Sequence, residues 1–133
     1  MVINENSILY FSGTGNIFEI AEKVARKIEL KLINVVDLLE EKTIEIDCEV
    51  VGLVFPIYFG GVPKIIGRII DKMVSIKLKY TFALATYGGM PENPFRILEN
   101  ELRKKEIKLD AGYLITMPDN YIAVIGARRR CIF

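Results

Sequence analysis

Residues 8–28 read ILYFSGTGNIFEIAEKVARKI, which is an apolar run, a loop of small polar residues and an amphipathic stretch in succession. The first four residues are apolar without alternation, which is typical of a strand buried on both faces of a parallel sheet. Beyond the loop, apolar residues recur at helical spacing and charged residues lie between them. The apolar stripe consists of Ile17, Ile20, Ala21, Val24 and Ile28. The segment therefore predicts a strand, a tight loop and a helix.

The same alternation runs through most of the chain. Further apolar runs, which predict buried strands, lie at residues 50–55, 81–85 and 113–117, with a weaker run at 31–36. Further amphipathic stretches, which predict helices, lie at residues 62–73 and 94–107. Strands that alternate with helices indicate an α/β fold, here a doubly wound sheet of five parallel strands. We expect residues 1–133 to form one domain.

The end of the chain departs from this pattern. Only residues 118–133 follow the fifth predicted strand, and three of them are the consecutive arginines at 128–130. A doubly wound domain of five strands usually closes with a helix against one sheet face. We expect that closing helix to be short or missing, which would leave an apolar face exposed and favour a homodimer.

The composition excludes several classes of function. Of 133 residues, 51% are hydrophobic, 26% are charged and none is histidine, so catalysis and metal binding through histidine are excluded. The 18 basic and 17 acidic residues give a net charge of +1, which provides no electrostatic reason to expect nucleic acid as a partner. Cys48 and Cys131 fit no metal or disulfide pattern, so we expect no metal site and a location in the reducing cytoplasm. The longest uncharged stretch, residues 50–63, is too short to span a membrane.

The loop at residues 12–16 combines small residues with hydroxyl and amide side chains at the start of a helix. Strand-to-helix loops of such folds meet at the carboxyl edge of the sheet, where ligands bind. Backbone N–H groups at a helix start attract anions, so the loop predicts a phosphate site that uses neither Lys nor Arg. A helix start capped by Asn16 is the simpler alternative. The chain lacks the lysine of a Walker loop, and Phe18 stands where the dinucleotide fingerprint needs a small residue.

Two further loops share one composition. Residues 56–63 contain Tyr58, Phe59 and a Gly-Gly pair, and residues 86–91 contain Tyr87 followed by a Gly-Gly pair. Aromatic side chains beside adaptable glycine peptides suit a planar aromatic ligand. Packing of the aromatic side chains onto the core, or an ordinary glycine-rich turn, are the alternatives. Both loops are expected at the same edge as the first loop.

Residues 10–16, YFSGTGN, closely resemble the FMN phosphate loop of flavodoxins, and the resemblance extends through residues 56–63 and 86–91. Residues 117–121, MPDNY, resemble a segment of proteins that fuse a flavodoxin-like domain to a two-cluster ferredoxin. Such a ferredoxin region needs eight cysteine ligands, so the ferredoxin part is absent here. The resemblance implies a flavodoxin-like fold with the strand order 2-1-3-4-5 and noncovalently bound FMN.

The resemblance also assigns the residues of an FMN site. The phosphate would be held by Ser12, Gly13, Thr14, Gly15, Asn16 and Ile17. The flavin ring would lie between one wall formed by Pro56, Tyr58, Phe59, Gly60 and Gly61 and a second wall formed by Thr86, Tyr87, Gly88 and Gly89. Ile17 stands where flavodoxins often have threonine, so only its backbone amide would contribute. The chain has no tryptophan and is near neutral, whereas flavodoxins are strongly acidic.

Three functions are consistent with this interpretation. The first is an electron carrier with bound FMN, which needs no catalytic side chain and would exchange electrons with a protein such as a ferredoxin or a reductase. The second is an FMN-dependent reductase that passes electrons from NADH or NADPH to a quinone. The third is an abbreviated domain that has lost FMN and acts only through protein contacts.

Overall fold

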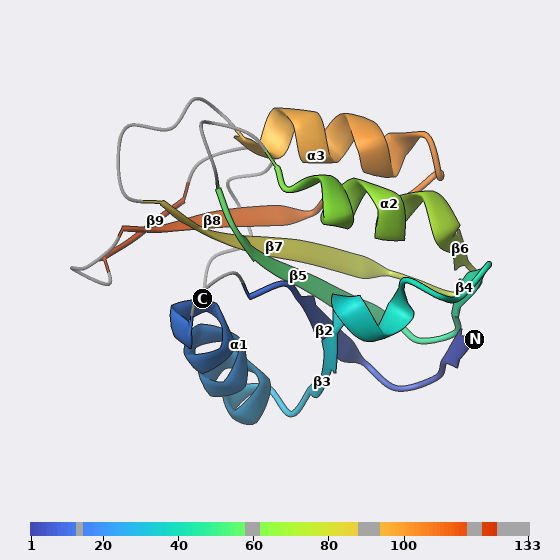
Figure 1. Cartoon of the computed structure of the whole chain (residues 1–133), viewed down its shortest axis with the longest axis horizontal. Helices are drawn as coiled ribbons and strands as arrows, with labels where there is room; N and C mark the ends of the chain where they lie inside the picture. Colours follow the sequence, from blue (N-terminus) through green and yellow to red (C-terminus); the bar gives the residue numbers. More distant parts are fainter. Residues whose placement is uncertain (13–14, 58–61, 88–93, 117–120, 125–133) are drawn as a thin grey trace.

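The computed structural model describes residues 1–12, 15–57, 62–87, 94–116 and 121–124, and its main element is a six-stranded sheet (Figure 1). In spatial order the strands are β3 (Lys31–Asn34), β2 (Ser7–Tyr10), β5 (Val50–Pro56), β7 (Tyr80–Tyr87), β8 (Ala111–Thr116) and β9 (Tyr121–Val124). The first five strands are parallel and β9 pairs antiparallel with β8. The sheet therefore differs in detail from the expected order 2-1-3-4-5, because the five expected strands are followed by a sixth.

A second sheet of three short parallel strands continues the main sheet at its amino edge. The strands β1 (Val2–Ile3), β4 (Ile44–Ile46) and β6 (Met73–Ser75) precede β2, β5 and β7 along the chain and lie in the same order. Short breaks at residues 4–6, 47–49 and 76–79 separate the two sheets. The sequence did not predict this small sheet, because strands of two or three residues are too short to carry a hydrophobic period.

Three helices cover the two faces of the main sheet (Figure 1). The helices α2 (Lys64–Lys72) and α3 (Pro94–Arg103) lie side by side on one face, and α1 (Gly15–Lys27) lies on the other. Each helix buries part of its predicted apolar stripe, but Ile28 is 42% exposed because α1 ends at Lys27, and Ala25, which the sequence did not place on the stripe, is buried. The buried residues of the three helices are Ile66, Ile69 and Ile70 of α2, Phe95, Leu98 and Leu102 of α3, and Ile17, Ala21 and Ala25 of α1. None of the helices in the described parts of the chain is long and apolar enough to cross a membrane.

Two predicted elements end earlier than expected. The strand expected to reach residue 36 ends at Asn34, whose side-chain oxygen accepts a hydrogen bond from the Val36 N–H and starts the 3-10 helix η1 (Val35–Leu38). The helix expected to reach residue 107 ends at Arg103. There, Glu106 adopts a left-handed φ of 59° and the Ile107 N–H donates to the Leu102 carbonyl, which closes the helix.

The sheet face around α1 is not the exposed apolar surface that the sequence led us to expect. Phe82, Leu84, Tyr113 and Ile115 on this face are all buried. After β8 the described chain continues as the strand β9, and the expected place of a closing helix, residues 125–133, lies outside the described residues. These four positions therefore give no support to the homodimer, which was expected because this face would be exposed.

Two strand glycines make room for phenylalanine rings on opposite faces of the sheet. A Cβ atom at Gly52 would lie 2.3 Å from Cζ of Phe82, whose strand pairs with β5 at this position. A Cβ atom at Gly112 would lie 2.8 Å from Cδ2 of Phe95 in α3. Both glycines are thus fixed by close packing, since either added methyl group would overlap a buried ring.

Candidate functional site at the carboxyl edge of the sheet

The strand order creates a switch point between β2 and β5. From β2 the chain passes through α1 to β3 on one side, and the next main strand, β5, lies on the other side of β2. In open α/β sheets, ligands bind at the carboxyl ends of the strands that flank such a point. The loop predicted to bind phosphate follows β2, and the two predicted ring-binding loops follow β5 and β7. All three loops therefore leave the sheet at one edge, from three neighbouring strands.

The first loop begins with a main-chain bond across the switch point. The Phe11 N–H donates to the Val54 carbonyl over 2.9 Å, and half-buried Ser12 follows. Gly13 and Thr14 lie outside the described residues, as does the side chain of Asn16, and the backbone of Gly15 and Asn16 begins the first turn of α1. This first turn contains no acidic residue, so no carboxylate opposes an anion there.

Ile17 points into the core. Its side chain is fully buried in the cluster that includes Ile8 and Ala21. This burial agrees with the expectation that only its backbone amide is available to a ligand.

The second and third loops start from strands that are bonded to each other at the edge. Pro56, the last residue of β5, is in register with Thr86 of β7, and the next N–H, that of Ile57, donates to the Thr86 carbonyl over 2.8 Å. Pro56 and Thr86 are buried, and the backbone of Tyr87 ends β7. The two loops thus leave from a shared, bonded base.

Six residues expected to form the walls lie outside the described part of the chain. They are Tyr58, Phe59, Gly60, Gly61, Gly88 and Gly89. The structure therefore brings Ser12, Ile17, Pro56 and Thr86 to one region and leaves the remainder of the expected site as a prediction.

One aromatic contact at this edge was not anticipated. The rings of Tyr10, at the end of β2, and Phe18, in the first turn of α1, meet edge to face with centroids 5.6 Å apart. Phe18 remains 42% exposed. The sequence signal was available, because an aromatic residue at a strand end and another in the first turn of the next helix flank the same short loop.

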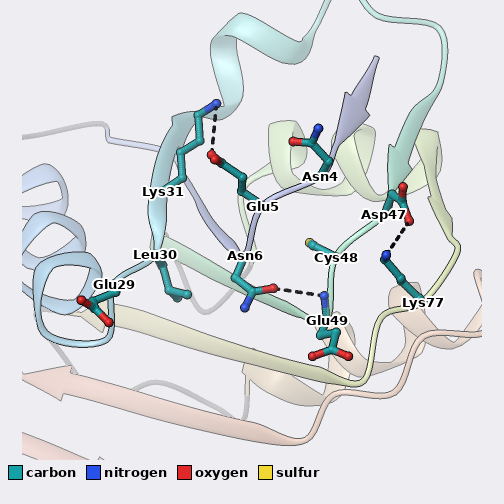
Figure 2. Close-up of a pocket in the computed structure, with 10 residues that line it drawn as sticks. All are labelled: Asn4, Glu5, Asn6, Glu29, Leu30, Lys31, Asp47, Cys48, Glu49 and Lys77. Carbon is teal, nitrogen blue, oxygen red and sulfur yellow. Dashed lines mark hydrogen bonds and ion pairs between the residues drawn. The ribbon is translucent and has the colours of Figure 1, made fainter.

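A cavity of about 630 Å³ lies at the opposite, amino edge, beside the breaks between the two sheets (Figure 2). Its lining consists of Asn4, Glu5, Asn6, Glu29, Leu30, Lys31, Asp47, Cys48, Glu49 and Lys77. Burial raises the pKa of the Cys48 thiol, which donates to the Val50 carbonyl. Within the described residues no group of three cysteine or acidic side chains is arranged to hold a metal ion. We refer to this space as the amino-edge cavity.

Comparison with known proteins shows that the fold of this chain is similar to part of a solved structure. No protein-family model and no curated protein matches the sequence. Among solved structures, the metal-soaked Flv1 flavodiiron core from Synechocystis sp. PCC6803 matches with a TM-score of 0.56 and 17% sequence identity. The match covers 84% of this chain and 30% of that structure, so this chain corresponds to less than a third of its length. Together with the parallel sheet and its three helices, the match fits a flavodoxin-like α/β fold.

Proposed function

We propose that the chain binds FMN noncovalently at the carboxyl edge of the sheet and serves as an electron-transfer protein. The observation that carries this proposal is the position of the switch point. The strands β2 and β5 flank it, and the loop that resembles the phosphate loop of flavodoxins follows β2. A redox role also agrees with the likeness in fold to a flavodiiron core.

The first turn of α1 supports binding of a dianionic phosphate. The helix has 13 residues, and its unbonded N–H groups and dipole favour an anion at Gly15. The hydroxyl groups of Ser12 and Thr14 and the amide of Asn16 are suitable additional donors. Because the loop has no basic residue and the first turn has no acidic one, neutral donors would hold the phosphate. This donor set fits the phosphate of FMN.

The other two loops supply the proposed ring site. Tyr58 and Phe59 of the second loop and Tyr87 of the third offer aromatic surface, and the glycine pairs beside them permit a close approach of the backbone. The bond between the Ile57 N–H and the Thr86 carbonyl supports a fixed spacing between the bases of these loops. FMN, when bound, supplies the one- and two-electron chemistry, and the chain supplies position and surroundings.

A protein such as a ferredoxin or a reductase would exchange electrons with this site. The resemblance of residues 117–121 to flavodoxin-like domains fused to two-cluster ferredoxins supports a partner of this class.

Titration with FMN and with riboflavin, followed by flavin fluorescence and calorimetry, tests the proposal. We expect saturable binding of FMN and at least ~100-fold weaker binding of riboflavin, because riboflavin lacks the phosphate. Absence of saturable FMN uptake by the folded chain, or equal affinity for the two flavins, would refute the phosphate site. Steady oxidation of NADH with a quinone by the FMN-loaded chain would instead indicate the reductase.

A pair of threonine variants locates the phosphate. Thr14→Asp places a carboxylate beside the proposed anion and should weaken FMN binding by ~100-fold or more, because juxtaposed like charges cost several kcal/mol. Thr43→Asp makes the same change at an exposed position before β4 and should leave FMN affinity within about twofold. Thermal unfolding of both variants verifies that they are folded. Equal loss of affinity in the two variants would contradict the assignment.

A further inference from the structure

The small sheet has a covered face and an open face. Ile3, Ile44, Ile46 and Met73 are buried in the cluster that also contains the apolar residues of α2 and α3. The register pairs Val2 with Glu45 and Glu45 with Val74, so these three side chains lie side by side on the other face. Val2 and Val74 are 51% and 45% exposed, and Glu45 is exposed as well. The open face thus presents a carboxylate between two apolar side chains.

Ile76 extends this open face. Its N–H donates to the Ile46 carbonyl over 3.0 Å, a bond that belongs to the pairing of Ile46 with Ser75 at the end of β6. Ile76 directly follows β6 and is 53% exposed, so it adds apolar surface beside the small sheet. We therefore count Ile76 with Val2, Glu45 and Val74 as the exposed residues of the open face.

The amino-edge cavity adjoins the open face. Asp47 follows β4 and Lys77 follows Ile76, and their ion pair of 3.5 Å forms part of the cavity wall (Figure 2). We call the open face and the cavity together the amino-edge surface.

The amino-edge surface is negatively charged within a chain of net charge +1. When Lys79, which pairs with Glu49 beside the cavity, is included, the surface holds five carboxylates and three ammonium groups, a local net charge of −2. The carboxylates are those of Glu5, Glu29, Glu45, Asp47 and Glu49, and the ammonium groups are those of Lys31, Lys77 and Lys79. Ion pairs join Glu5 to Lys31, Asp47 to Lys77 and Glu49 to Lys79. Glu29 and Glu45 form no ion pair within the part of the chain that the structure describes.

We propose that the amino-edge surface binds a basic segment of a partner protein. Apolar side chains of the segment would cover Val2, Val74 and Ile76, and a lysine or arginine would pair with Glu45. Covering the apolar residues removes Glu45 from water, which is costly for a carboxylate unless a cation comes with the partner. The net charge of −2 attracts the same kind of segment.

The same charges disfavour other occupants. A second copy of the chain docked through this surface would bring its own Glu45 and cavity carboxylates against the first set, and like charges across an interface cost several kcal/mol. A nucleic acid would present phosphates to a negative surface. A basic protein segment is the occupant that satisfies both the apolar face and the carboxylates.

This inference does not rest on FMN binding. The amino-edge surface and the proposed FMN site lie at opposite ends of the sheet, separated by the seven residues of β5, which span about 20 Å. The chain could therefore bind the segment with or without flavin.

Fluorescence anisotropy with two labelled peptides tests the proposal. Both peptides have seven residues, of which four are valines and three are either lysines or glutamates. We expect the lysine peptide to bind the full chain with a Kd below about 1 mM and the glutamate peptide not to bind at that concentration. Failure of the lysine peptide to bind, or equal affinity for the two peptides, would overturn the proposal.

Charge-reversal variants identify the surface that binds. Glu45→Lys should weaken binding of the lysine peptide by at least ~10-fold, and Glu101→Lys, the same charge reversal on α3 at a residue that pairs with Lys104, by less than about twofold. Equal effects of the two variants would overturn the assignment. Val74→Ser is the second probe in case Glu45→Lys does not fold, and it should weaken binding by about threefold or more. Sedimentation of the free chain completes the test, since a concentration-dependent dimer that Glu45→Lys alters would favour a second copy as the occupant.

Discussion

The two ends of the sheet hold their strands in different ways. At the amino edge, side chains bind the strand starts: Asn6 accepts the N–H groups of Glu49 and Val50, and Asp110 accepts that of Thr81. At the carboxyl edge, the described cross-strand bonds that follow β2 and β5 run between main-chain groups of Phe11 and Val54 and of Ile57 and Thr86. The comparison indicates that polar side chains hold the strands together at the amino edge, whereas main-chain bonds do so at the described positions of the carboxyl edge.

A substitution midway between the two edges should destabilise the sheet at both of its ends. Gly52→Ala places a methyl group against the ring of Phe82 and should lower the free energy of unfolding by about 3 kcal/mol. Gly67→Ala is the matched control in α2, where a Cβ atom meets nothing within 4 Å, and should raise stability by about 0.5–1 kcal/mol. Urea unfolding measures both values. A tolerated Gly52→Ala would show that the Phe82 ring can move away.

Loss of an amino-edge carboxylate should lower stability without affecting the proposed ligand site. Asp110→Ala removes the acceptor of the buried Thr81 N–H and should cost about 2 kcal/mol. Asp110→Asn keeps an acceptor oxygen and should cost less than half as much. FMN affinity of the folded fraction should stay within about twofold in both variants. Equal stability of the alanine and asparagine variants would show that the bond contributes little.

Asn6 provides a milder test of the same edge. Asn6→Ala removes the side-chain acceptor for two N–H groups, and because Asn6 is exposed, water replaces part of the loss, so we expect a cost of about 1 kcal/mol. Asn6→Asp retains the acceptor. Hydrogen exchange should show faster exchange of the Glu49 and Val50 amides in Asn6→Ala alone. Unchanged exchange at these amides would contradict the role given to Asn6.

The ends of α1 and α3 at the amino edge offer a gain in stability. Glu29 and Glu106 have φ angles of 55° and 59°, a conformation that glycine adopts without strain. Glu29→Gly and Glu106→Gly should each raise the free energy of unfolding by about 0.5–1 kcal/mol, measured by urea unfolding. A loss of stability in both variants would show that contacts of the glutamate side chains outweigh the backbone strain.

The smallest expected effect is a pH dependence from Cys48. Burial raises the pKa of this thiol in the folded chain, so the unfolded chain begins to release the thiol proton at a lower pH. The free energy of unfolding should therefore fall as pH rises above about 8.5, the ordinary value for a thiol, and Cys48→Ala should reduce this slope. Urea unfolding between pH 7 and 10 provides the comparison. An identical slope in Cys48→Ala would remove Cys48 as the cause.

The sequence predicted the parts of the fold that have long hydrophobic periods. The runs at residues 50–55 and 81–85 form β5 and β7, and the helical stripes form α1, α2 and α3. The small sheet escaped prediction because Val2–Ile3 and Ile44–Ile46 gain their strand conformation from pairing with each other and burial against α2 and α3. Pairing of this kind depends on tertiary contacts rather than on local pattern.

The candidate site was predictable in location more than in detail. Loops at residues 12–16, 56–63 and 86–91 follow β2, β5 and β7, and parallel topology alone brings their starting points to one edge. The burial of Ile17 follows from its place on an apolar stripe. The proximity of Tyr10 and Phe18 follows from their places on either side of the first loop, whereas their edge-to-face geometry depends on the angle at which the helix leaves the loop.

The interior position of β2 has a consequence for synthesis of the chain. β2 is made before both of its neighbours, β3 and β5, and the second of these ends at Pro56. At about 5–20 residues per second, the ribosome needs about 2–9 s to add the 46 residues between Tyr10 and Pro56. During that interval Ile8 and Leu9 have a strand partner on one side at most, so the burial of these two residues is completed only after β5 has been made.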